Sequence, residues 1–143
     1  MPLKQRDAHQ LIEAAQAHAA TLGIRVTVAV VDEGTHLVAL SRMDGAPPVS
    51  PQIAEAKAVG TAAWLREGDG LAQVQQERPA FFAQVDQMVR RPIMPGAGSL
   101  LVHEGDQVLG AVGVSGGRPD EDVACAQAGL AAVLGERRSG RSG

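Results

Sequence analysis

The chain has 143 residues, a formal net charge of −3 and a hydrophobic share of 45%, which suit a single globular domain. Aromatic residues make up 2% and the sequence shows no basic stripe, so a surface that binds nucleic acid through phosphates or stacked bases is not expected. There is no apolar signal segment and no run long enough to cross a bilayer. We expect a cytoplasmic protein without nucleic-acid or membrane partners, in which residues 1–135 form the domain and 136–143 a disordered tail.

The first third of the chain predicts a helix followed by a hairpin. Residues 3–22 place apolar side chains at helical spacing, and Gly23 is a suitable C-terminal cap. The segment 24–32, IRVTVAVVD, alternates as a strand does, with one face expected to be clearly more buried. DEGT at 32–35 is typical of a turn, and 36–43 predicts the antiparallel partner strand.

A proline-rich loop separates this hairpin from the next helix. Ser50 and Pro51 are a good N-cap and first-turn pair for a helix that runs to about Leu65. Residues 66–92 are the least decisive stretch, and we expect polar loops with one short helix after Pro79.

The last third predicts a second hairpin and a final helix. SLLVHEGDQVLGAVGV reads as strand, turn and strand, and the helix after it begins near Asp120 and reaches about Leu134. Two hairpins separated by helices indicate an α+β fold: an antiparallel β-sheet with helices packed on its faces, a profilin-like α-β-α sandwich.

The glycine-rich stretch GAVGVSGG could be mistaken for a phosphate-binding loop. Its spacing of Gly110, Gly113 and Gly116 is not that of a dinucleotide fingerprint, and no Gly-Lys-Ser/Thr ends it. The acidic residues at 120–122 suit a helix start and would repel phosphate. Bare positions at Gly110 and Gly113 instead let another backbone, a helix or a flat ligand approach the strand, while Gly116 and Gly117 form the turn.

The four histidines do not cluster, and no H-x-E or H-E-x-x-H pattern supports a hydrolytic zinc site. On the first helix, His18 lies about 70° from the centre of the apolar stripe and His9 about 110° away, at 100° per residue. His9 should therefore face water, whereas His18 can face a groove or a subunit interface. A histidine at a helix edge is more often structural or solvated than a ligand.

Other chemistry-bearing residues are scattered. Arg42 and Asp44 lie where a strand enters a rigid loop, a common place for binding residues. Lys57, on a mostly apolar helix, can snorkel to solvent, pair with a carboxylate, or bind an acidic ligand. Ser115 sits in a glycine turn and reads as a turn or cap residue rather than a nucleophile. The single cysteine, Cys125, allows no internal disulfide or cysteine-based zinc site and is expected to be a buried, inert thiol.

Three quoted segments carry a family resemblance: VVDEGTHLVALSRMDGAP, AEAKAVGTAAW and PGAGSLLVHEGDQVLGAVGVSGGRPDEDVACAQAGLAA. Together they resemble the GlcG/HbpS family, which includes haem-binding HbpS proteins and the C-terminal domain of PduO-type proteins. The matching blocks cover roughly residues 24–64 and 93–133. The resemblance implies an α-β-α sandwich with an antiparallel sheet, assembly into homo-oligomers, and binding of haem or another tetrapyrrole.

Three functional hypotheses follow. In the leading one the protein binds a small ligand, haem or another tetrapyrrole, and His18 is the iron ligand. The candidate ligand-binding residues are His18, Arg42, Asp44, Lys57, Gly113 and Ser115. In the alternative, a small cofactor-independent enzyme uses the same groove for acid–base chemistry, with Lys57, Asp44 and Glu121 as candidate catalytic groups. In the third, the motifs serve assembly alone, through close packing of alanine-rich helices.

Overall fold

A four-stranded antiparallel sheet forms the centre of the molecule. The computed structural model describes the backbone of residues 3–142 and the side chains of residues 3–134. The strands are β1 (Thr27–Asp32), β2 (Leu37–Arg42), β3 (Ser99–Glu104) and β4 (Gln107–Ser115), in the order β2-β1-β4-β3. Both predicted hairpins are present, and β1 and β4 pair antiparallel to join them.

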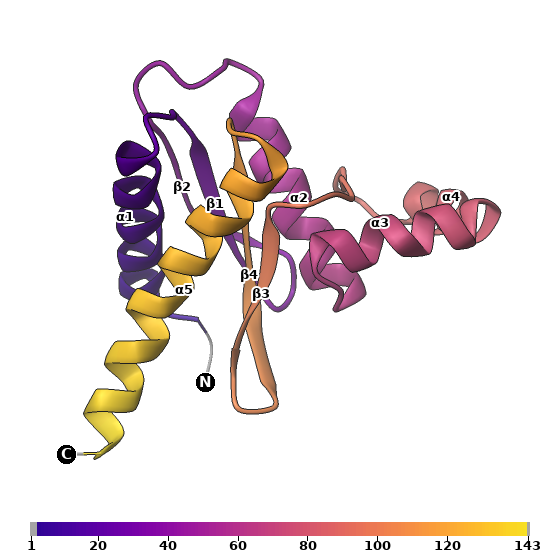
Figure 1. The fold of residues 1–143 in the computed structure, drawn as a ribbon. Helices are drawn as coiled ribbons and strands as arrows, with labels where there is room; N and C mark the ends of the chain where they lie inside the picture. Colours follow the sequence, from indigo (N-terminus) through magenta and orange to yellow (C-terminus); the bar gives the residue numbers. More distant parts are fainter. Residues whose placement is uncertain (1–2, 143) are drawn as a thin grey trace.

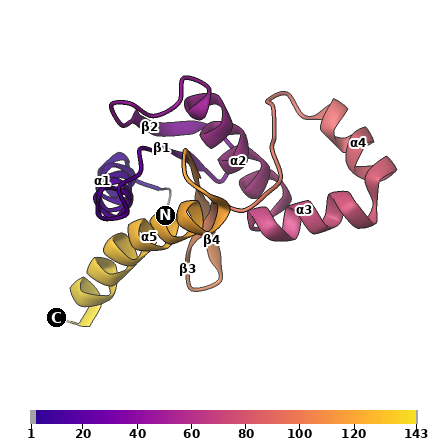
Figure 2. The same cartoon turned by 45° about the horizontal axis from the view of Figure 1, so that its top comes forward.

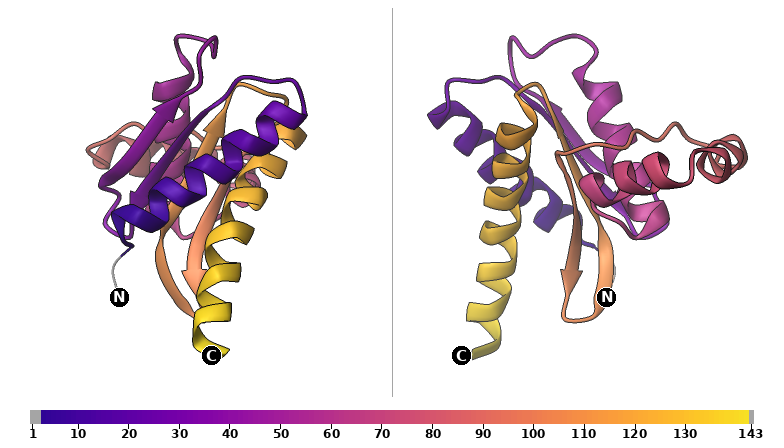
Figure 3. Two further views of the ribbon diagram at one scale, coloured as in Figure 1. Left: turned by 90° about the vertical axis from the view of Figure 1, so that its left-hand side faces the viewer. Right: turned by 45° about the vertical axis from the view of Figure 1, so that its right-hand side comes forward.

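Helices cover both faces of this sheet. On one face, α1 (Gln5–Thr21) and α5 (Pro119–Ser142) pack against each other, and α2 (Ser50–Trp64) lies on the opposite face (Figure 1, Figure 3). Two short helices, α3 (Gly68–Glu77) and α4 (Pro79–Met88), project away from the sheet beyond α2 (Figure 2). The predicted α+β class, with an antiparallel sheet and helices on its faces, is confirmed.

Strand β1 is buried on both of its faces. Val28 and Val30 belong to the core beneath α1 and α5, whereas Val31 packs with residues of α2. Thr27 and Ala29 are also fully buried. The expectation of one clearly more buried face is therefore wrong, because a central strand covered by helices on both sides has no solvent face.

Gly113 allows α2 to approach the sheet closely. A Cβ atom at this position would lie 2.2 Å from the carbonyl oxygen of Ala54 and 2.9 Å from the amide nitrogen of Ala58. These distances are far below van der Waals contact, so only glycine fits without a backbone shift. Another backbone, a helix or a flat ligand was expected to approach the strand here, and in the structure the neighbour of Gly113 is helix α2 of the same chain.

The end of α1 is confirmed, and the start of α2 differs from expectation. Gly23, at φ +73°, follows the last turn of α1, although Leu22 before it is 41% exposed rather than part of the buried stripe. The N-cap of α2 is Val49, and Ser50 is already helical. The Ser50 hydroxyl donates to the Pro47 carbonyl at 2.6 Å instead of capping the helix.

Residues 66–92, which we call the arm, contain two helices where one was predicted. The predicted helix after Pro79 is present as α4. Helix α3 was missed because its sequence, GDGLAQVQQE, has few apolar residues and two glycines, and only Leu71 anchors it as a fully buried side chain. The arm is held to α2 by Trp64, whose ring stacks on Phe82 with centroids 5.3 Å apart.

Helix α5 starts at Pro119, close to the predicted position, and its backbone is assigned through Ser142. The side chains of residues 135–143 lie outside what the structure describes. The single domain over 1–135 and the disordered tail over 136–143 therefore stay predictions.

Candidate functional site

Lys57 and Asp122 form a buried ion pair where β4 passes into α5. The Lys57 Nζ donates to the Val114 carbonyl at 2.9 Å and lies 3.4 Å from the Asp122 Oδ2. Lys57 is 9% exposed and Asp122 is 3% exposed. Of the three roles considered for Lys57, the structure shows pairing with a carboxylate.

The Asp122 carboxyl is shaped by opposing influences. Burial raises its pKa above the ordinary value, while the amide of Gly117, which donates to Asp122 Oδ1 at 2.9 Å, and the nearby Lys57 ammonium act to lower it. Burial is the larger effect. The pair ties α2 to the end of β4 and the start of α5.

The other acid–base candidates do not join this pair. Glu121 accepts the Arg118 amide at 2.9 Å and pairs with the Arg118 guanidinium at 3.7 Å, as a residue of a helix start does. Asp44 is exposed, and its carbonyl accepts a hydrogen bond from Arg25. Neither carboxylate makes an ion pair with Lys57 in the described part of the chain, and catalytic roles for Lys57, Asp44 and Glu121 stay a prediction.

The remaining ligand candidates lie in two different settings. Arg42 donates from its guanidinium to the Ala46 carbonyl, which braces the loop after β2. Ser115 is 6% exposed and lies opposite Thr27 in the β1–β4 ladder. Gly113 is covered by α2. At Gly113, strand β4 is therefore part of the packed interior and not the floor of an open pocket.

His18 lies near the C-terminal end of α1 and is half-buried. Its imidazole makes no hydrogen bond or ion pair with any residue whose side chain is described, whereas His36 pairs with Asp32 at 3.1 Å and His103 contacts the Gly105 carbonyl. α1 packs on the sheet face opposite α2, so His18 and Lys57 are not brought together (Figure 3).

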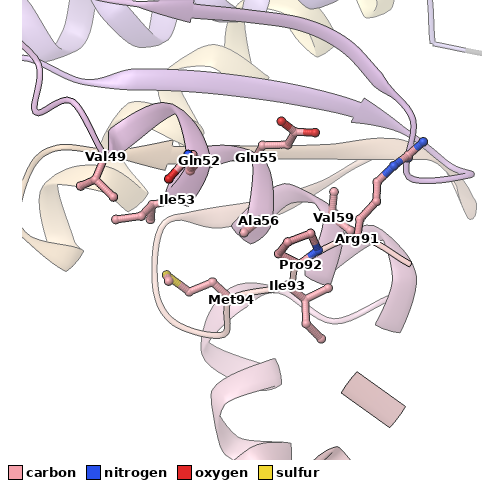
Figure 4. A pocket seen from close by; sticks show the side chains of 10 residues that line it. All are labelled: Val49, Gln52, Ile53, Glu55, Ala56, Val59, Arg91, Pro92, Ile93 and Met94. Atoms are coloured by element: carbon pink, nitrogen blue, oxygen red, sulfur yellow. The ribbon is translucent and has the colours of Figure 1, made fainter. Parts of the chain in front are cut away.

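An apolar pocket of about 640 Å³ lies between α2 and the chain segment that returns from the arm (Figure 4). Its lining residues are Val49, Gln52, Ile53, Glu55, Ala56, Val59, Arg91, Pro92, Ile93 and Met94. Sequence reasoning missed this pocket entirely. Its only signal was the segment RPIM at 91–94, which places an arginine beside apolar residues in a proline-bounded loop.

A smaller pocket of about 360 Å³ lies between α1 and the edge strand β2. His9, Glu13 and Gln16 line it from α1, and Gln16 donates to the Ser41 carbonyl at 2.9 Å. The exposure predicted for His9 is confirmed. Across the described side chains no three His, Cys, Asp or Glu residues are grouped as a metal site.

Cys125 is confirmed as a buried thiol. Burial, with smaller contributions from Asp122 and Glu121, raises its pKa to about 11. A thiol that stays protonated is a poor nucleophile and a poor metal ligand. None of the described helices has the length and apolar character required to cross a membrane.

These features define the class of the protein: an α+β domain with a two-sided antiparallel sheet, a histidine on one side that no described side chain engages, and an apolar pocket on the other. The family model described as "Haem degrading protein HbpS-like" matches residues 3–131. The chain belongs to this HbpS-like family, as the resemblance in the sequence predicted.

Relatives in sequence and structure agree with this assignment. Protein GlcG of Escherichia coli K12 is 38% identical over 115 residues, which cover 79% of this chain and 81% of GlcG. The corrinoid adenosyltransferase PduO of Citrobacter freundii is 30% identical over 93% of this chain, but the match spans only 39% of PduO.

Two solved structures superpose closely. A PduOC:heme complex has a TM-score of 0.82 and 28% identity, with 92% of this chain and 95% of that chain covered. HbpS has a TM-score of 0.82 and 30% identity, with 94% and 91% covered.

Proposed function

We propose that this protein binds haem or another tetrapyrrole and that His18 is the residue that ligates its iron. The observation that carries the proposal is the close match, over nearly the whole of both chains, to a PduO domain solved with haem bound. A cytoplasmic location belongs to the same proposal.

One residue, His18, has the side chain that such a ligand requires. A neutral imidazole nitrogen is a common ligand of haem iron, and the imidazole of His18 is engaged by no other described side chain. Haem would supply redox or oxygen chemistry at its iron, while this chain would hold the iron and limit the access of water.

His18 lines neither of the two pockets described above. A flat ring bound at a half-buried helix edge needs a second wall to cover its apolar face. A second copy of the chain would supply that wall if His18 faces a subunit interface. We therefore include homo-oligomer formation in the proposal.

A haem titration of the purified protein, read by the Soret band, tests this function. Wild type should give a Soret band distinct from that of free haem, and His18→Ala should lose most of this change. His9→Ala is the matched control, because His9 lies on the same helix and is exposed, and it should bind as wild type does.

A wild-type spectrum identical to that of free haem would end the haem proposal. Equal binding by wild type and His18→Ala would leave haem binding in place but remove His18 as the ligand. Circular dichroism of each variant separates loss of binding from loss of fold.

A further inference from the structure

We propose that the apolar pocket beneath α2 is a second, separate binding site, which takes an organic monocarboxylate with an apolar body. No residue assigned to haem binding lines this pocket.

The size and lining of the pocket suit a small organic molecule. Small-molecule sites in proteins are typically about 300–1,000 Å³, mostly apolar, with a few polar groups that orient the ligand. This pocket, at about 640 Å³, falls within that range. Ile53, Ala56 and Val59 of α2 face Ile93 and Met94 of the returning segment across it (Figure 4).

Arg91 supplies the group that selects an anion. Its Nη1 donates to the Thr35 carbonyl in the β1–β2 turn, which holds the guanidinium at the end of the pocket nearest that turn (Figure 4). Within the described part of the chain Arg91 makes no ion pair. A guanidinium has five donors in a planar fork that matches a carboxylate, so those not used by Thr35 remain for a ligand.

Glu55 limits the ligand to one negative charge. Glu55 is one of the residues that line the same pocket, and its carboxylate has no cationic partner among the described residues. A second carboxylate on the ligand would meet like charge there, whereas a hydroxyl or amine could donate to it. The pocket therefore favours a monoacid over a diacid of the same length, and it disfavours haem, which carries two propionates.

The site is independent of the proposed haem ligand. The pocket is lined by α2, and His18 belongs to α1, which covers the opposite face of the sheet (Figure 1). Removal of either site should leave the other intact, so the two proposals can fail separately.

Calorimetric titration of the full chain with octanoate and with 1-octanol tests the site. These probes share an apolar chain and differ in charge. Octanoate should bind wild type, and Arg91→Gln should weaken it by about tenfold or more, since charge-assisted hydrogen bonds are lost. Binding of 1-octanol should change little. Octanedioate should bind wild type more weakly than octanoate does.

Arg90→Gln is the matched control, because Arg90 is the exposed neighbour that does not line the pocket. Arg90→Gln and His18→Ala should both bind octanoate as wild type does. Ala56→Leu, which reduces the cavity without touching a charge, should weaken both probes. Thermal unfolding shows that each variant is folded.

Absence of octanoate binding by wild type at millimolar concentration overturns the proposal. Equal octanoate affinity for Arg91→Gln and Arg90→Gln also overturns it. Loss of octanoate binding in His18→Ala would place the ligand at the other face and contradict the separation of the two sites.

Discussion

Lys57 shows how one residue's role depends on a contact that sequence cannot reveal. From the sequence alone, snorkelling to solvent and pairing with a carboxylate or an acidic ligand were both open. The structure selects Asp122, which is 65 residues away along the chain. Nothing local to the helix identifies that partner, because only the packing of α2 on β4 brings the two side chains together.

We expect Lys57→Met to lower the free energy of unfolding at pH 7 by about 3 to 5 kcal/mol, because it leaves the Asp122 charge buried without a cation. The loss should shrink on acidification. Asp122 of this variant binds its proton more tightly in the folded state than in the unfolded chain. The free energy of unfolding therefore rises as the pH falls through the pKa of the folded state. The rise ends near pH 3.9, about the pKa of an ordinary Asp in the unfolded chain. Urea unfolding between pH 4 and pH 8 measures this.

The control is the double variant Lys57→Met/Asp122→Asn, in which no carboxylate remains to titrate. This pH dependence should be absent from it. A Lys57→Met stability that is independent of pH, or equal to that of wild type, would contradict the structural role given to the pair.

The arm is the element that the sequence described least well. Its first helix, α3, contains two glycines and few apolar residues, which weakens the helical signal of that stretch. The sequence did mark Pro79 as a helix start, and α4 begins there. What fixes the arm is the tertiary contact of Trp64 with Phe81 and Phe82.

Phe82→Ala should destabilise the arm by about 3 to 5 kcal/mol, because Phe82 is 4% exposed and loses both its buried volume and its stack on Trp64. Trp64 is the only tryptophan, so its fluorescence during urea unfolding reports this element directly.

Phe81→Ala provides the comparison at this scale. Phe81 is 41% exposed and lies against the Arg78 guanidinium, 4.1 Å from the ring centroid. Its loss should cost about 1 kcal/mol. Equal effects of the two substitutions would show that the arm is not anchored by the buried ring.

At the scale of the whole molecule, the sheet separates the two proposed binding surfaces. The α1 and α5 side carries His18, and the α2 side carries the apolar pocket and the arm. Several large apolar side chains remain on the outside of a single chain: Leu37, Val49, Leu65 and Met88. They give a single chain apolar surface that assembly could cover.

Sedimentation velocity should therefore show a homo-oligomer at micromolar concentration, with the mass independent of added haem if the assembly precedes ligand binding. A monomer across that concentration range would contradict self-association and would remove the second wall invoked for a tetrapyrrole at His18.

The sequence by itself determined the class of fold, the two hairpins, the main helices and the family. These follow from local periodicity, turn chemistry and motif order, which short stretches of chain encode. Only the tertiary structure decided the partner of Lys57, the burial of both faces of β1, the covering of Gly113 by α2 and the pocket beside Arg91. Each of these depends on how segments far apart in the sequence pack against one another, and no local sequence pattern specifies that packing.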